Sequence, residues 1–147
     1  MKITFTVIIL TILLCVSQRS FSQEKNWGIG VRLGFPSGIT VKKYMGTNAL
    51  ELIAGNHWAN GIGLQLHYLI HNEIITDELD WYFGAGGQVR FPYNSDFDLG
   101  VDGVIGFEYT FEGDQFSAFL DGNVFLEIID DPFQPWAQAS IGVRYNF

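Results

Sequence analysis

From Trp27 to the C-terminus, large apolar residues occupy every second position in a series of segments separated by turn residues. Between Trp27 and Phe35 every odd position holds a large apolar residue, whereas the even positions hold Gly or Arg. A period of two places one set of side chains on each face of a β-strand. No segment in this region shows the 3.6-residue period of an amphipathic helix. The pattern therefore predicts an all-β protein.

Eight such segments follow one another with short connections. They cover residues 27–35, 38–44, 50–55, 61–71, 81–91, 99–109, 116–126 and 138–147. Ile53, Phe119 and Phe125 are exceptions, because they fall in the polar series of their segments. An even number of up-and-down strands closes into a barrel without unpaired edges, and strands of about ten residues can cross a bilayer when tilted. We expect residues 23–147 to form an eight-stranded antiparallel up-and-down transmembrane β-barrel.

The glycines indicate which face of the barrel wall points inward. The bore of an eight-stranded barrel is only just wide enough for side chains to fill it, so small residues belong there. Of the 17 glycines, 12 lie in the polar series: Gly28, Gly30, Gly34, Gly38, Gly55, Gly61, Gly63, Gly84, Gly86, Gly100, Gly106 and Gly142. We expect the polar face to line the bore and the apolar face to contact lipid. The alternative is a soluble, lipocalin-like exported carrier with its apolar face inside.

Charged residues of both signs share the predicted bore. Four cations and four anions form this expected barrel-interior charge network: Arg32, Lys42, Arg90 and Arg144 with Glu51, Asp102, Glu108 and Asp121. Burying an unpaired charge is costly, whereas opposite charges can neutralise one another. We interpret the network as a structural plug of the bore. A polar conduit is the functional alternative, although little room would remain for a solute.

The N-terminal 22 residues are interpreted as a cleaved signal peptide. Lys2 precedes an apolar stretch that is too short for a transmembrane helix, and Ser20 and Ser22 fit cleavage before Gln23. Cys15 lies in this segment; a lipid anchor on it is disfavoured, because Leu13 and Leu14 stand where a small residue is usual. Removing the segment leaves 8 − 2 = 6 basic residues against 16 acidic ones, a net charge of −10. Such a chain repels nucleic acid, so nucleic-acid binding is excluded.

Aromatic residues gather at the strand ends, as expected at bilayer interfaces. Trp27, Trp81, Phe116, Tyr145 and Phe147 lie at one end, and Phe35, Trp58, Phe91 and Trp136 at or near the other. The last strand ends on Phe147 with Tyr145 two residues before it, and so resembles the C-terminal assembly signal of Gram-negative outer-membrane β-barrels. Residues 30–44 resemble the first hairpin of the small, eight-stranded, porin-like members of that group.

The resemblance implies a location in the cell outer membrane, insertion by the barrel-assembly machinery, and both termini in the periplasm. The outer loops would then lie near Pro36 and at 56–60, 92–97 and 127–135, with a longer inner turn at 72–79. These outer loops are short, whereas adhesive or receptor members of the family tend to have longer ones. We expect a monomer in contact with outer-membrane lipid, with a structural or surface-interaction role.

No pattern for catalysis, a cofactor or a metal stands out. A lipid-modifying barrel enzyme is the minority hypothesis, with His57 beside Ser37, Ser95 or Asp98. His67 and His71 share a strand face but lie roughly 13 Å apart, too far to bind one metal ion together. His67 is expected to be a hydrogen-bond partner in the bore, and His57 and His71 loop or rim residues. The acidic residues Asp96, Asp98, Glu127, Asp130 and Asp131 are assigned to the outer loops as solvated charges rather than a divalent-cation site.

Overall fold

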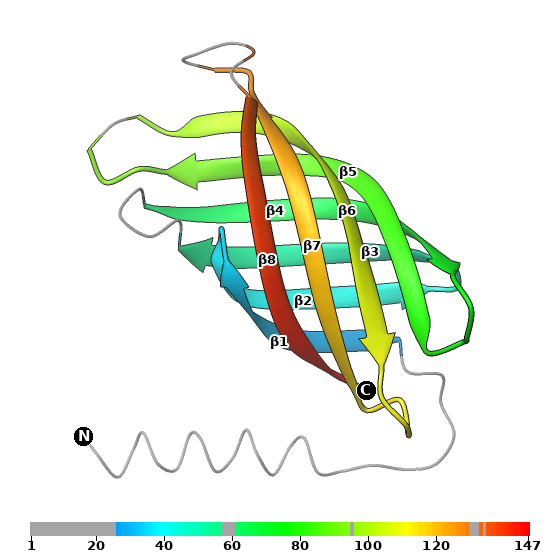
Figure 1. The fold of residues 1–147 in the computed structure, drawn as a ribbon. Helices are drawn as coiled ribbons and strands as arrows, with labels where there is room; N and C mark the ends of the chain where they lie inside the picture. The colour runs from blue at the N-terminus through cyan, green and yellow to red at the C-terminus, as the bar shows by residue number, and fades with distance from the viewer. Residues whose placement is uncertain (1–25, 57–60, 95, 130–132, 134) are drawn as a thin grey trace, which may run out of the picture.

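A computed structural model of the protein describes residues 26–56, 61–94, 96–129, 133 and 135–147. It contains eight strands, each antiparallel to the next, and β8 pairs with β1 to close the barrel (Figure 1). The strands are β1 (Trp27–Gly34), β2 (Ser37–Met45), β3 (Asn48–Asn56), β4 (Ile62–Glu73), β5 (Leu79–Phe91), β6 (Asp98–Thr110), β7 (Phe116–Glu127) and β8 (Pro135–Asn146). The predicted eight-stranded antiparallel barrel is confirmed. The predicted signal peptide and Trp58 lie outside the described residues.

The two ends of the barrel differ in what they hold. At one end of the barrel, called the terminal end, the first and last strands meet. There Trp27 and Phe147 exchange backbone hydrogen bonds of 3.1 and 2.7 Å. The connections β2–β3, β4–β5 and β6–β7 lie at this terminal end, and the other four connections lie at the opposite, loop end (Figure 1). Among the described residues, no helix is long and apolar enough to span a membrane.

Strands β2 to β8 each extend beyond the predicted segment at one end or both, and three of these extensions change an assignment. β4 continues to Glu73 and pairs it with Asp80 of β5, so the inner turn covers only residues 74–78. β7 continues to Glu127, which therefore belongs to the wall and not to an outer loop. β8 begins at Pro135, because its first residues pair with the end of β7. Backbone hydrogen bonding across a long hairpin outweighs the weak local pattern at strand ends.

Along the strands, buried and exposed side chains alternate in step with the polar and apolar residues of the sequence. On β4, Gln65 is 1% exposed and the adjacent Leu66 is 52% exposed. The outward series of the strands carries the large exposed apolar side chains, and the inward series carries most of the buried polar ones. The apolar face is therefore on the outside of the barrel.

Phe119 and Phe125 point into the bore and are buried there. Each lies over a glycine of a neighbouring strand: a Cβ atom added at Gly142 would lie 2.4 Å from Cζ of Phe119, and one added at Gly100 would lie 2.4 Å from Cε2 of Phe125. The two side chains thus fill space that glycine leaves free. The exceptions in the polar series are bore-filling residues.

Candidate functional site: the charged bore

All eight charged residues of the expected network lie on the inward face of the barrel. Seven of them are buried, with Lys42 at 0% exposure, whereas the Arg90 side chain is 14% exposed. Their positions follow from the strand period, which brings every second residue into the bore. Which residue meets which partner depends on the closed register of the barrel.

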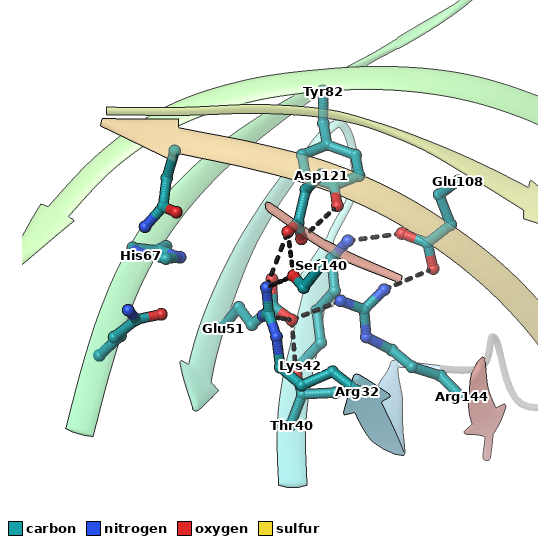
Figure 2. A network of polar contacts seen from close by, with 12 residues as sticks. Arg32, Thr40, Lys42, Glu51, His67, Tyr82, Glu108, Asp121, Ser140 and Arg144 are labelled. Atoms are coloured by element: carbon teal, nitrogen blue, oxygen red, sulfur yellow. Dashed lines mark hydrogen bonds and ion pairs between the residues drawn. The ribbon is translucent and has the colours of Figure 1, made fainter. Parts of the chain in front are cut away.

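Lys42, Glu108 and Arg144 form the first part of the network. Lys42 Nζ lies 2.5 Å from Glu108 Oε2, and Arg144 Nη1 lies 3.3 Å from Glu108 Oε1. Arg144 also forms an ion pair with Glu51 through its other terminal nitrogen. Figure 2 shows these side chains converging from β2, β3, β6 and β8. Two cations and two carboxylates therefore neutralise one another in the bore.

Arg32 and Asp121 form the second part. Arg32 Nη2 donates to Asp121 Oδ1 at 2.7 Å and also to the hydroxyl of Ser140, which in turn donates to Asp121 at 2.5 Å. The Tyr82 hydroxyl donates to the second carboxylate oxygen of Asp121 at 3.0 Å. Arg32 Nη1 lies 3.8 Å from Glu51 Oε1, which joins the two parts into one network.

Neutral hydroxyl groups complete the coordination of the carboxylates. Thr40 donates to Glu51 at 2.5 Å, and Tyr44 and Ser117 donate to the same oxygen of Glu108 at 2.5 and 2.9 Å. A buried carboxylate that accepts several hydrogen bonds is far less costly than an isolated one. Sequence reasoning did not single out these hydroxyl residues, because Ser, Thr and Tyr are common on both faces of strands.

Asp102 and Arg90 lie apart from this network. Asp102 Oδ2 lies 2.8 Å from His67 Nε2 and accepts a hydrogen bond from Asn123 at 3.0 Å. Arg90 lies over the ring of Phe125 and forms ion pairs with Asp98 at 3.0 Å and Glu127 at 3.4 Å.

Asp98 and Glu127 were predicted as solvated loop charges, and this assignment was wrong. Both are strand residues that pair with Arg90, and Glu127 is buried. Glu127 continues the inward series of Asp121 and Asn123, a signal that the sequence contained. Asp96 is exposed, and Asp130 and Asp131 lie outside the described residues.

Between the network and the loop end, carboxamides span the bore. Gln65 donates to Gln88 at 2.7 Å and to Gln138 of β8 at 3.2 Å. Other inward side chains are fully buried as well: Thr40, Ile53, Leu69, Tyr82 and Phe125 come from five strands and are each 0% exposed. An interior of this kind can hold paired charges away from water.

The structure describes only some residues of the predicted enzyme site and of the histidines considered for metal binding. Ser37 exchanges hydrogen bonds with the backbone of Gly34, and His71 lies 3.5 Å from Asp80. His57 and Ser95 of the hypothetical enzyme site lie outside the described residues. Within the described part of the chain, no group of three or more His, Cys, Asp and Glu residues could hold a metal ion.

Comparison with known proteins gives a likeness in structure alone. No protein-family model matches the chain, and no curated protein matches it. The barrel is similar to the crystal structure of the N-terminal beta-barrel domain of Pseudomonas aeruginosa OprF, with a TM-score of 0.63 and 17% sequence identity. The match covers 85% of this chain and 100% of that chain. The protein therefore has the fold of that β-barrel domain.

Proposed function

We propose that this protein is an integral outer-membrane β-barrel whose bore is plugged by side chains and whose loop end faces the cell surface. The observation that carries the proposal is the distribution of side chains across the wall. Large apolar residues such as Leu33, Leu66 and Ile141 are exposed on the outside, while paired charges fill the inside. Soluble monomers rarely expose contiguous apolar surface beyond a few hundred Å². A lipid bilayer is the solvent that suits this outer face.

This distribution is the reverse of what a lipocalin-like carrier requires. Such a carrier needs an apolar cavity inside and a polar surface outside. Here Lys42, Glu51 and Arg144 occupy the bore. The soluble alternative is therefore disfavoured by the same observation that supports a membrane protein.

Two features favour the outer membrane. The fold is similar to the N-terminal beta-barrel domain of Pseudomonas aeruginosa OprF, and the terminal strand ends with the Tyr145 and Phe147 pattern that resembles an outer-membrane assembly signal. On this proposal the barrel-assembly machinery inserts the chain after export, the terminal end faces the periplasm, and the protein is a monomer. The Tyr145 side chain packs on Phe116 and Phe147 with ring centroids 5.4 and 6.3 Å apart.

The role that fits a plugged bore is structural or interactive, without enzymatic activity. On this proposal the ion pairs of the network close the bore to solutes, so we expect no conductance in planar bilayers. A polar conduit would instead produce discrete current steps. The lipid-modifying alternative predicts turnover of labelled lipid that disappears in His57→Ala.

The proposal is tested by membrane fractionation followed by electrophoresis of unboiled and boiled samples. We expect the protein in the outer-membrane fraction, resistant to extraction with urea, as a compact unboiled band whose mobility changes on boiling. Recovery in the periplasm without detergent, with no change in mobility, would contradict the proposal and favour a soluble carrier.

A further inference from the structure

Lys43 is the one charged residue that the eight described strands direct away from the bore. Every other Asp, Glu, Lys and Arg of these strands belongs to the inward series. Its neighbour Lys42 is fully buried, whereas Lys43 is exposed. On an outer face whose other strand residues are uncharged, a single cation needs an explanation.

The described residues directly beside Lys43 are an aromatic and an aliphatic one. Nζ of Lys43 lies 5.3 Å from the ring centroid of Trp27, its register partner on β1. Among the described residues Lys43 has no salt bridge. On the other side, Lys43 pairs with the apolar Leu50 of β3. An ammonium and an indole ring thus lie together at the terminal end of the outer face.

The three connections at the terminal end differ in charge. The β2–β3 turn beside Lys43 is Gly46-Thr47 and carries no charge. The connections β4–β5 and β6–β7 carry the acidic residues Asp77, Glu78, Glu112 and Asp114. Among these described residues, an anionic group that approaches the terminal end is repelled by the acidic connections and attracted at Lys43.

The chemistry of the pair matches the boundary between lipid tails and head groups. A lysine on an apolar surface extends its alkyl chain along that surface and places its ammonium among the head groups. Tryptophan is enriched at the same depth. There the ammonium meets phosphate oxygens, and its attraction is strongest for a head group with net negative charge.

We propose that Lys43 and Trp27 form a binding site for the head group of an anionic glycerophospholipid in the leaflet next to the terminal end. This site rests on the proposed membrane location. Lys43 supplies the charge that selects an anionic over a zwitterionic head group. Trp27 holds the lysine stem at the interface and has no part in the selection by charge.

Native mass spectrometry tests the site on the full chain, folded in detergent and mixed with equal amounts of phosphatidylglycerol and phosphatidylcholine of identical acyl chains. We expect the folded wild type to retain phosphatidylglycerol over phosphatidylcholine by about fivefold. Lys43→Gln should lose this preference and Lys43→Arg should keep it. Leu50→Gln is the matched control, because it adds the same polar group beside Lys43 without removing charge, and its preference should equal that of the wild type.

A preference that is absent in the folded wild type, or that survives in Lys43→Gln, would overturn the lipid site. Raising the ammonium acetate concentration from 20 to 500 mM tests the wild type without any substitution, since screening should abolish the preference. A preference unchanged by salt would also overturn it. The proposed function fails by a different result, namely a protein that shows no heat-dependent mobility and does not enter phosphatidylcholine vesicles.

Discussion

The two faces of the barrel wall are built from alternate residues of the same strands, yet they are stabilised differently. On β4, Gln65 donates hydrogen bonds to Gln88 and Gln138 across the bore, whereas the adjacent Leu66 is exposed on the outside. Inside, the charged side chains pair with particular partners from other strands. Outside, each side chain needs only an apolar environment. The difference shows that the choice of residue in the bore depends on its partner side chains. The choice of residue on the outer face depends on the apolar surroundings.

The largest effect is expected where a bore charge loses its counter-charge. Glu108→Gln keeps the size of the side chain but leaves Lys42 and Arg144 with one carboxylate fewer. Breaking a buried pair typically costs about 3–5 kcal/mol, and we expect a loss of this size in the free energy of unfolding by urea in phosphatidylcholine vesicles. The double variant Glu108→Gln/Lys42→Met should be more stable than the single one. A loss below about 1 kcal/mol in Glu108→Gln would show that the bore charges are not coupled.

A charge placed on the outer face should have the next largest effect. Leu66 lies at the centre of the outward series of β4, so Leu66→Lys is expected to cost about 2–4 kcal/mol in the same unfolding assay. Ile62→Lys, at the end of that series, should cost less, because the lysine reaches the interface. Equal costs at both positions would argue that the outer face does not cross a bilayer.

Two glycines of β6, one on each face of the wall, differ in the space that surrounds them. A Cβ added at the inward Gly106 would lie 2.5 Å from Cζ of Tyr82 and 2.8 Å from Cβ of Asp121. At the outward Gly103 the nearest atom would be 3.9 Å away. We expect Gly106→Ala to destabilise the barrel by about 1–3 kcal/mol and Gly103→Ala to change its stability by less than about 0.5 kcal/mol. Thermal midpoints of both variants in detergent check this, and the reverse order would contradict the assignment of the faces.

The smallest effect concerns a single hydroxyl group. Tyr82→Phe removes the hydrogen bond to Asp121 in the bore and is expected to cost about 1 kcal/mol. Tyr68→Phe on the outer face is the control and should change the free energy of unfolding by less than half as much. Indistinguishable losses in the two variants would mean that the Tyr82 hydroxyl adds nothing to the network.

The fold could be predicted from the sequence because alternation is a local signal that survives in most segments. It identified the eight strands and also the residues that face inward. The pairing could not be predicted: Lys42 meets Glu108, and Arg32 meets Asp121, 89 positions away, only because closure fixes the register around the barrel. Glu127 was assigned to a loop because the acidic residues and proline that follow it are typical of a loop. The inward positions of Phe119 and Phe125 could not be explained from the sequence, because the glycines that they cover, Gly142 and Gly100, belong to neighbouring strands.

Cysteine labelling at Gln65 and Leu66 tests most directly which side of the wall meets lipid. In a chain with Cys15→Ser, Leu66→Cys in phosphatidylcholine vesicles should react with a maleimide dissolved in the bilayer and not with a water-soluble one. Gln65→Cys should react with neither until the protein is unfolded. A Gln65→Cys that the bilayer reagent labels in the folded protein, or a Leu66→Cys that the aqueous reagent labels in a folded, detergent-free protein, would contradict the proposed membrane barrel.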